Sequence, residues 1–590
     1  MDEKNIWKEK ISDALNALLK EANTETQIKS CDVVAEIPPS PEMGDLGFPM
    51  FPFAKILRKA PPVIAQLVLQ KITGLINDNG QNENEKKPEV SAAGPYINVR
   101  LDRASFAASL LKEVLDETKA WTKGTSLNGR RIMVEFSSPN TNKPLHLGHL
   151  RNDVLGESIS RILICAGADV RKVCIINDRG IHICKSMLAY KEKFAGITPE
   201  SIGKKSDHFV GDCYVQYSKL EKEDAHAIER ARELLIKWEA GDAETTALWK
   251  KMNDWTVDGI KKTYKRCGVS FDKYYFESQT YLRGKEEVLK GLEKNIFFRA
   301  EDGSVQADLT AENLDTKILL RKDGTSLYIT QDFGTVIMRH DEWLFDKLIY
   351  VVGNEQRYHF QVLFTLLSRL GFDWAKNLYH LSYGMVNLPE GRMKSREGTV
   401  VDADDLIDEL KSMALNEIRQ KEREEAVGDA CATAEKIALG ALHYFLLQIT
   451  PDKDMLFNPA ESISFNGNTG PYLQYMGARI SSLLRRIKND DKKNEVKHCE
   501  LLTNDAEWEL LKTIADWPQT LTLAAEKINP SVITAYLYEM SKNFSRFYHD
   551  CPVLNAEEDL AAARLNLCRA VLRVLKDALE LVCIPFLETM

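Results

Sequence analysis

The chain has 590 residues, too many for one ordinary hydrophobic core, so we expect two to four domains. A hydrophobic share of 44% with 28% charged residues is ordinary for a soluble globular protein, and no apolar run is long enough to span a bilayer. The net charge of −9, from 78 basic and 87 acidic residues, argues mildly against a nucleic-acid partner but leaves room for a local basic groove.

The first ten residues lack the apolar stretch of a signal peptide, and the 11 cysteines are scattered without a C-x-x-C pair. This distribution argues against a zinc ribbon or a disulfide framework and fits reduced thiols in the cytoplasm. We therefore expect a cytoplasmic protein that has no membrane contact and binds no zinc. Nothing in the pattern indicates a dimer interface, so a monomer is the default expectation.

Residues 1–125 are predicted to form a small α/β module. Residues 6–19 have the apolar spacing of an amphipathic helix, and residues 31–38 form a short apolar run. Glycine turns from Gly44 onward lead into a second predicted helix, residues 78–88 are a polar loop, and residues 95–101 a strand.

Residues 131–151 combine a strand, a loop and a helix. Residues 132–136 are apolar except for Glu135, residues 137–144 are rich in Ser, Pro and Asn, and leucine, isoleucine and valine then recur at helical spacing to Leu163. A second βα unit follows, with a predicted strand at residues 170–176. Strands alternating with helices predict a parallel sheet, whose ligands bind at the carboxyl ends of the strands. Residues 137–149 and 177–180 would lie there.

The helix that follows the loop begins with two histidines, His146 and His149. A helix N-terminus has unpaired N–H groups and a partial positive charge, and is a ready site for phosphate. Residues three apart share a helix face, so both imidazoles could donate to one polyphosphate. Gly148 leaves space where a flat base could approach the backbone, and Lys143 adds a cation just upstream. The alternative for an isolated H-x-G-H pattern is a turn that merely caps and packs.

Residues 191–265 are helical and of mixed charge, for example residues 221–238, and are interpreted as a solvated helical insertion. Residues 271–278 predict a strand, followed by a helix at 283–295. Residues 325–334 lead into a helix around Val336, and residues 348–353 predict a buried strand that opens onto another helix. Residues 385–401 close the sheet domain.

The C-terminal part of the chain is predicted to be almost entirely helical. Residues 402–455 form a helical connector, and residues 456–590 a bundle whose first long helix begins after Gly470 and Pro471. Residues 489–500 are polar and loop-like. Later helices cover roughly residues 505–517, 519–528, 531–548 and 557–582.

The loop and helix start, Ser-Ser-Pro-Asn-Thr-Asn-Lys-Pro-Leu-His-Leu-Gly-His-Leu-Arg at residues 137–151, resemble the HIGH motif of class I aminoacyl-tRNA synthetases, and the lead-in resembles arginyl-tRNA synthetases in particular. The resemblance implies an α/β fold with three main parts. These are an N-terminal additional domain at residues 1–125 that contacts the tRNA elbow, a Rossmann-like parallel-sheet catalytic domain at 126–401 with its insertion at 191–265, and, after the connector, an all-α anticodon-binding bundle at 456–590.

The same resemblance implies an arginine site. A guanidinium holds five donors in a rigid plane and is matched best by carboxylates. The positions that match the family's arginine site are Asn140, Glu277, Tyr328, Asp332 and Gln356. From the residues alone, Glu277, Tyr328 and Asp332 are each typical of helix caps or surface positions. Tyr328 and Asp332 are four apart and would share a face if they lie in a helical turn. The family usually has Arg where Gln331 stands, which leaves the role of that neighbour open.

The ATP side implied by the resemblance comprises the two histidines, Gly148 and a second signature loop. The family's Lys-Met-Ser-Lys-Ser loop corresponds to a segment in which the second lysine is replaced by serine, with the residues Arg392, Met393, Lys394, Ser395 and Arg396. Many arginyl-tRNA synthetases depart in the same way, and a lysine upstream of the HIGH-like motif then supplies the charge. Lys143 occupies that place.

The resemblance implies the following reaction. The carboxylate of L-arginine attacks the α-phosphorus of ATP, which enters as its Mg²⁺ complex, pyrophosphate leaves, and the arginyl group passes to the 2′-hydroxyl of the terminal adenosine of tRNA(Arg). No general base is needed, because the attacking carboxylate is already ionised near neutral pH. The family usually needs bound tRNA even for activation.

Aromatic and basic residues of the C-terminal bundle are candidates for tRNA contact. Tyr472 and Tyr475 could stack on splayed bases, and Arg479 and Arg486 could bind phosphates, with core packing and surface solvation as the alternatives. Two other functions are considered. A nucleotidylyltransferase also uses an H-x-G-H at a helix start but predicts no bundle after the second signature loop. A non-enzymatic, synthetase-like tRNA-binding protein predicts loss of the histidines or of the substrate carboxylates.

Overall fold

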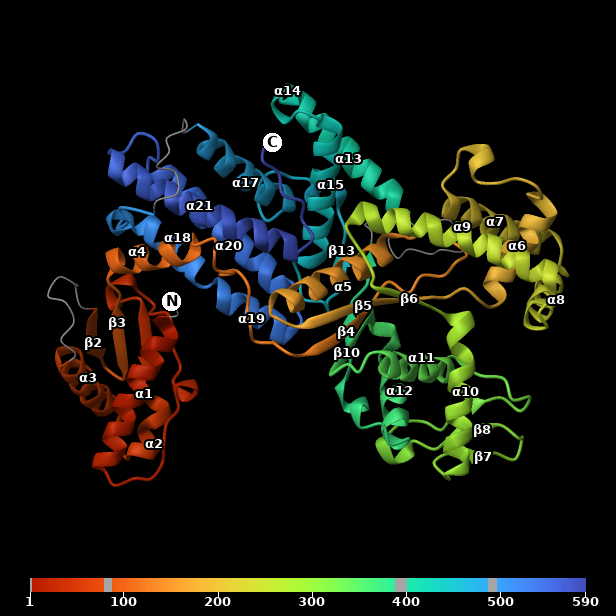
Figure 1. Cartoon of the computed structure of the whole chain (residues 1–590), viewed down its shortest axis with the longest axis horizontal. Coiled ribbons are helices and arrows are strands. Elements are labelled where there is room, and N and C mark those ends of the chain that lie inside the picture. Colours follow the sequence, from red (N-terminus) through yellow and green to blue (C-terminus); the bar gives the residue numbers. More distant parts are fainter. Residues whose placement is uncertain (1–2, 79–87, 388–400, 487–495) are drawn as a thin grey trace. The chain divides into compact units, whose positions relative to one another are not determined.

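The computed structural model describes residues 3–78, 88–387, 401–486 and 496–590 (Figure 1). The chain divides into two compact units. The first comprises Met1–Thr122, Leu483–Pro518 and Glu539–Val574, and the second comprises Lys123–Ser482, Gln519–Tyr538 and Leu575–Met590.

The N-terminal part of the first unit is a small α/β fold. An antiparallel sheet of order β1-β3-β2 is formed by β1 (Leu46–Pro49), β2 (Glu89–Ala93) and β3 (Tyr96–Arg100). It shares a core with α1 (Glu3–Glu21), α2 (Ala54–Leu57) and α3 (Pro61–Asp78). The predictions of a helix at 6–19 and a strand at 95–101 are confirmed. The glycine turns lead to a helix as predicted, α2, but the strand β1 forms between them and pairs with β3.

The remaining helices of the first unit pack through a few buried polar contacts. They include α4 (Arg103–Val114) and α18 (Asp505–Ala515). Trp508 of α18 donates its indole N–H to the Asp45 carboxylate at 2.8 Å. The buried pair of Arg564 Nε and Glu507 Oε1 is 2.7 Å apart. In each contact a carboxylate accepts the hydrogen bond of a buried donor, so neither donor is left unsatisfied on folding.

A five-stranded parallel sheet organises the second unit. Its strands are β4 (Arg131–Glu135), β5 (Asp169–Ile176), β6 (Lys273–Phe276), β10 (Lys347–Gly353) and β11 (Leu378–Tyr383). Their order is β11-β10-β4-β5-β6, and every neighbouring pair is parallel. The strand order reverses between β4 and β10, which is where ligands of doubly wound sheets bind. The predicted parallel sheet is confirmed, although β11 was not anticipated.

Helices follow the strands as predicted. They are α5 (Leu147–Cys165), α6 (Ile181–Lys193), α10 (Glu277–Glu293), α11 (Tyr328–Glu342) and α12 (Arg357–Arg369). Met133, Val173 and Leu348 of the sheet share one core with α11 and α12. The helix predicted at 283–295 begins six residues earlier, at Glu277, so that residue lies in the first helical turn. Between α10 and α11 an unpredicted antiparallel sheet forms from β7 (Phe298–Arg299), β8 (Val305–Ala307) and β9 (Lys317–Leu320).

The helical insertion consists of α7 (Ser206–Glu223), α8 (Ala227–Glu239) and α9 (Ala243–Cys267). The stretch 221–238 is helical as predicted, apart from a turn between α7 and α8. Asp224 ends α7, and its carboxylate accepts the His226 N–H at 2.9 Å in a turn. The insertion has a hydrophobic core of its own with α6, built around Met187, Phe209 and Ala231.

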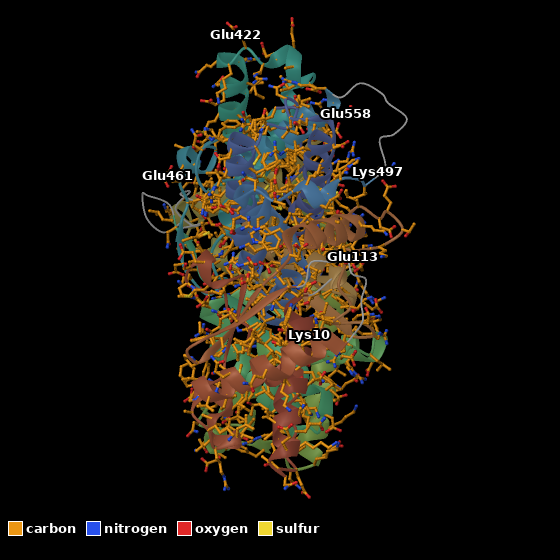
Figure 2. The ribbon with its side chains drawn as sticks, turned by 90° about the vertical axis from the view of Figure 1, so that its left-hand side faces the viewer. Lys10, Glu113, Glu422, Glu461, Lys497 and Glu558 are labelled. Carbon is orange, nitrogen blue, oxygen red and sulfur yellow. The ribbon has the colours of Figure 1, made fainter. Side chains whose placement is uncertain are left out.

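The chain after residue 401 is helical, as predicted. The helices are α13 (Ala403–Gln420), α14 (Glu424–Val427), α15 (Ala430–Leu447), α16 (Pro459–Ser462), α17 (Gly470–Arg485), α19 (Trp517–Lys527), α20 (Ser531–Asp550) and α21 (Glu558–Leu581). The described part of the segment 385–401, which was predicted to close the sheet domain, contains β12 (Val386–Asn387), which pairs with β13 (Met455–Leu456). Exposed charged side chains such as Glu422, Glu461 and Lys497 cover the outer surface (Figure 2). Among the described helices, none is long and apolar enough to cross a membrane.

Candidate functional site

The carboxyl ends of β4, β5, β6 and β10 bring most of the sequence-predicted residues to one edge of the sheet. β4 leads into the loop at 137–146, β5 into residues 177–180, and β6 directly into Glu277. β10 leads into the 3-10 turn Asn354–Gln356. A parallel sheet collects these loops because all its strands point the same way.

The two histidines cap the start of α5. His146 is the N-cap residue, and its Nδ1 accepts the Gly148 N–H at 3.1 Å. The Nδ1 atom of His149 accepts the His146 N–H at 3.2 Å, and the two ring centroids lie 3.9 Å apart. A Cβ on Gly148 would lie 3.0 Å from Cε1 of His146, so the glycine leaves room for that ring. The imidazole of His146 therefore uses the space beside Gly148, whether or not a bound ligand also uses it.

Both imidazoles are neutral near pH 7. Burial, with Lys143 nearby, lowers the pKa of His146 to about 3, and burial beside His146 lowers the pKa of His149 well below its usual value. Each Nδ1 accepts a hydrogen bond, so a neutral ring must carry its proton on Nε2. The site therefore has two Nε2–H donors in fixed tautomers at a helix N-terminus, where an anion is favoured. Burial also lowers the pKa of Lys143.

The loop between β4 and α5 is held by several backbone contacts. Ser137 and Ser138 have φ of +74° and +51°, and the Ser137 N–H donates to Asn152 Oδ1 of α5 at 2.5 Å. Asn140 bridges Asn177 in the neighbouring β5 loop, and its side chain is exposed. Asn140 is thus at the site edge, with its amide accessible.

Helix α9 of the insertion lies behind both loops. Tyr264 OH is 2.5 Å from Ser137 Oγ, and Thr256 Oγ1 donates to the Thr141 carbonyl at 3.0 Å. Trp249 Nε1 donates to the carbonyl of Asp178 at 2.6 Å. These α9 residues recur at intervals of seven and eight, which places them on one helix face. The interpretation of residues 191–265 as a merely solvated insertion is therefore wrong for α9.

Glu277 is a buried carboxyl group at the carboxyl end of β6. Burial raises its pKa to about 7, with Asp178 and Asp332 adding to the rise and Arg179 opposing it. Asp178 fixes the same turn, because its carboxylate accepts the Ser278 N–H at 2.9 Å and the Ser278 hydroxyl at 2.7 Å. The exposed fraction of Glu277 is 9%. A carboxylate in such a buried place favours a cationic ligand that replaces its lost hydration.

Asp332 and Tyr328 both lie in the first turns of α11, which confirms that they share a helix. Asp332 Oδ2 is 2.6 Å from Nε2 of His359, which lies three residues after Gln356. Tyr328 is 78% exposed and Gln356 is exposed at the end of its 3-10 turn. The structure therefore brings Asp332 close enough to Glu277 for the two charges to interact, and leaves Tyr328 and Gln356 open to solvent.

Arg392, Met393, Lys394, Ser395 and Arg396 lie outside the described residues. The described residues on either side of that segment are tied to α5. Arg151 is buried and donates to the carbonyls of Gly384 at 2.6 Å and Lys453 at 2.8 Å. Arg151 is the last residue of the motif at 137–151, and no role was predicted for it from the sequence. A basic residue inside an otherwise buried helix stretch was the available signal.

A buried ion pair lies on the β4 strand that leads into the loop. Glu135 pairs with Arg339 of α11, and Ser138 Oγ donates to the same carboxylate at 3.3 Å. Burial raises the pKa of Glu135, whereas the charge of Arg339 lowers it. Nε and Nη2 of Arg339 are buried without a hydrogen-bond partner among the described residues. The pair links β4, the loop and the helix that carries Asp332.

The candidate tRNA-contact residues lie along α17 and just beyond its end. Tyr472 is half-buried, with its ring 6.4 Å from that of Tyr538, and Tyr475 is 39% exposed. Arg479 is half-buried, and Arg486 is exposed just beyond the helix. Tyr475 and Arg486 are thus accessible, while Tyr472 is partly used in packing.

Three family models match consecutive parts of the chain. Residues 5–101 match the arginyl-tRNA synthetase N-terminal domain, residues 110–458 the catalytic domain of class I (R) tRNA synthetases, and residues 473–590 the DALR anticodon-binding domain.

Similar proteins cover the whole chain. It is 57% identical to the arginine–tRNA ligase of Treponema denticola, with 100% of each chain covered, and 53% identical to that of Treponema pallidum, with 99% of each covered. Among solved structures, the Thermus thermophilus arginyl-tRNA synthetase matches with a TM-score of 0.79 and 25% identity, covering 98% of this chain and 99% of that one. The Plasmodium falciparum enzyme, at 21% identity and a TM-score of 0.75 with 98% of each chain covered, has the same fold.

Proposed function

The chain belongs to the arginyl-tRNA synthetase family of class I, whose members activate arginine and charge tRNA, and from this premise we propose which of its residues carry the reaction. The observation that carries the proposal is the start of α5. The Nδ1 atom of each of two neutral imidazoles there accepts a backbone N–H. Each ring therefore carries its proton on Nε2, which gives two N–H donors at a helix N-terminus.

The ATP half of the site consists of His146, Gly148, His149 and Lys143. The two Nε2–H groups donate to the triphosphate, and Lys143 supplies the mobile positive charge. A bound triphosphate would favour the charged form of Lys143 and so offset the effect of its burial. The segment at 392–396 is proposed to complete this half with Arg392, Lys394 and Arg396. Mg²⁺ enters with ATP as part of the substrate.

The arginine half consists of Glu277 and Asp332, which bind the guanidinium, with Asn140, Tyr328 and Gln356 around them. A guanidinium between two carboxylates is the strongest of the common charged pairings, because it forms bidentate hydrogen bonds. Glu277, held protonated for part of the time by burial, would ionise when the cation binds. An uncharged amino acid would leave Glu277 neutral and would therefore bind more weakly.

The reaction then needs positioning and charge stabilisation rather than proton transfer. The arginine carboxylate attacks the α-phosphorus in line with the departing pyrophosphate, and the fixed donors at the α5 N-terminus stabilise the charge that develops. The adenylate then passes the arginyl group to the 2′-hydroxyl of the terminal adenosine of tRNA. The accessible Tyr475 and Arg486 are proposed to contact that tRNA, with Tyr472 and Arg479 beside them on the chain.

We assign residues 1–125 to tRNA-elbow binding, 126–401 to catalysis, 402–455 to the connector and 456–590 to anticodon binding. The protein is proposed to act as a monomer in the cytoplasm, where tRNA is charged for translation. The helices α13 to α21 that follow the catalytic part contradict the nucleotidylyltransferase hypothesis. The two histidines and both substrate carboxylates are present, contrary to the non-enzymatic hypothesis.

The test is pyrophosphate–ATP exchange with each of the 20 amino acids, with and without total tRNA. We expect exchange with arginine alone, and its loss without tRNA would mean that the acceptor completes the site. His146→Ala should raise KM for ATP and leave KM for arginine nearly unchanged. Asp332→Asn should raise KM for arginine and leave KM for ATP nearly unchanged. Absence of exchange with every amino acid, even with tRNA, would refute the proposed chemistry, and an unchanged KM for ATP in His146→Ala would remove that residue from the site.

A further inference from the structure

The carboxylate of Asp404 on α13 accepts hydrogen bonds from side chains at two places in the insertion, the start of α7 and the helix α9. Asp404 Oδ2 accepts Lys205 Nζ at 2.6 Å and Thr263 Oγ1 at 3.0 Å. Its other oxygen, Oδ1, accepts Arg266 Nη1 at 3.1 Å. Lys205 immediately precedes α7, whereas Thr263 and Arg266 lie on α9. We call these four residues the Asp404 clamp.

The backbone next to Asp404 pairs with the start of α5. The Ala403 N–H donates to the Leu145 carbonyl at 3.0 Å, and the Leu147 N–H donates to the Val401 carbonyl at 3.2 Å. These two bonds lie on either side of His146, which is bridged to Asp402. The position of the His146 ring is therefore coupled to that of residues 401–403, and the Asp404 clamp attaches the residue that follows them to the insertion.

The same insertion supports this loop at two further points. Thr256 of α9 donates to the Thr141 carbonyl. Gly211 of α7 lies so close that a Cβ there would be 2.8 Å from Cδ of Pro144. The insertion thus contacts the loop on both sides of Lys143, at Thr141 and at Pro144, and the Asp404 clamp links it to the segment that pairs with the end of that loop.

His208, Asp402 and Asp404 also have a spacing that could hold a metal ion. His208 Nε2 lies 3.4 Å from Asp402 Oδ2 and 3.6 Å from Asp404 Oδ2. However, both oxygens of Asp404 already face cationic side chains, and Arg266 also pairs with Asp408 at 2.5 Å and Glu435 at 2.7 Å. Cations so close to the carboxylate disfavour a metal and favour a purely protein ion-pair network.

We propose that Lys205 and Arg266 are positioning residues for ATP: they hold Asp404, and through the backbone of residues 401–403 they set the place of His146 and the α5 N-terminus. This inference rests on the proposed role of that N-terminus in binding ATP. Lys205 and Arg266 are 22% and 20% exposed, and Lys205 also pairs with the buried Asp207 at 2.9 Å. Loss of either cation therefore also lowers stability, and the comparison of the two KM values isolates its effect on the geometry of the ATP half. The insertion would then be part of the catalytic apparatus.

The experiment compares KM for ATP with KM for arginine in pyrophosphate exchange, with tRNA present throughout. Arg266→Ala and Lys205→Ala should each raise KM for ATP, and the double variant by roughly tenfold or more, because small displacements of catalytic groups carry large costs. KM for arginine should stay within about twofold, since Glu277 and Asp332 lie on α10 and α11, outside the Asp404 clamp. Arg266→Lys should restore part of the loss, because it keeps a cation on Asp404.

Arg230→Ala is the matched control. Arg230 is also an arginine of the insertion with two carboxylate partners, Asp224 at 2.6 Å and Glu192 at 3.1 Å, but both belong to the α6–α8 region. Arg230→Ala should leave KM for ATP and KM for arginine unchanged. If Arg266→Ala proves unfolded by circular dichroism, Arg266→Lys and Lys205→Ala carry the test.

The outcomes separate this inference from the proposed function. If His146→Ala raises KM for ATP but neither clamp variant does, the inference is overturned and the function of the α5 N-terminus stands. If His146→Ala has no effect on KM for ATP, the proposed function of that N-terminus fails on its own. Equal increases in both KM values in the clamp variants would mean general loosening of the site and would also overturn the inference.

Discussion

Arginine binding should weaken as the pH falls through neutrality, because Glu277 must be ionised to pair with a guanidinium. Burial raises the pKa of Glu277 to about 7, against a usual value of 4.5. The ionised fraction is then about 0.9 at pH 8 and about 0.1 at pH 6, and affinity scales with the fraction of competent protein. We expect kcat/KM for arginine to fall about tenfold between these pH values, equivalent to ~1.4 kcal/mol. If the pKa of Glu277 were at its usual value of 4.5, the ratio of kcat/KM at pH 8 to kcat/KM at pH 6 would stay near one.

The assay is pyrophosphate exchange at saturating ATP with tRNA present, because kcat/KM reports the pKa values of the free enzyme. The kcat/KM for ATP at saturating arginine serves as the internal control for pH effects elsewhere. Glu277→Gln, which cannot ionise, should give a low and pH-independent value. A flat profile in the unaltered protein would refute the reasoning, and so would a tenfold slope that persists in Glu277→Gln.

The same carboxyl group also affects stability, with the opposite dependence on pH from an ion-paired acid. Its folded pKa lies above its unfolded value, so the folded state binds the extra proton between about pH 4.5 and 7. The contribution of Glu277 to stability is therefore greatest below the unfolded pKa and is lost as the pH rises through about 7. Bound arginine should reverse this loss, because it stabilises the ionised form.

Three further predictions follow from the site geometry. Lys143→Ala should slow adenylate formation in single-turnover experiments more than it weakens tRNA retention on filters, and unchanged activation kinetics would reject its role. Asp178→Ala removes both hydrogen bonds that orient Ser278 beside Glu277. It should lower kcat/KM for arginine by about 10- to 100-fold, the loss expected for one to two charge-assisted bonds, and an effect confined to ATP would contradict this. Glu135→Gln leaves Arg339 buried without its counter-charge and should lower the free energy of unfolding by about 3 kcal/mol or more in calorimetry. Lys250→Ala, in an exposed pair, is its control and should change that free energy by less than about 1 kcal/mol.

Local sequence patterns were sufficient for most of the regular structure. The apolar run before residue 137 and the helical repeat after it predicted β4 and α5, and the C-terminal helices were placed within a few residues of their observed bounds. Periodicity works here because the spacing of apolar residues along the chain records which face of an element is buried. The strand β11 was missed because it is an edge strand whose half-exposed residues alternate only weakly.

The candidate site depended on both kinds of information. The motif and the family resemblance pointed to His146, His149, Glu277 and Asp332, and the structure places all four at or beside the carboxyl ends of the sheet. Their states could not be predicted. The tautomers of the imidazoles follow from two backbone N–H groups, and the raised pKa of Glu277 follows from burial beside two other carboxylates.

By itself the sequence determined most of the helices, the strands that lead into the site, the parallel sheet, and the residue types available for binding a triphosphate and a guanidinium. Only the tertiary structure decided which charges meet. Asp178 reaches a serine 100 residues away, Arg266 reaches Asp404 across 138, and Arg339 reaches Glu135 across 204. Such pairings depend on how whole helices pack back onto the sheet, and no local pattern records the partner of a charge, because many partners would give the same local pattern. The insertion therefore looked like a solvated appendage in sequence, and in three dimensions one face of α9 supports the site.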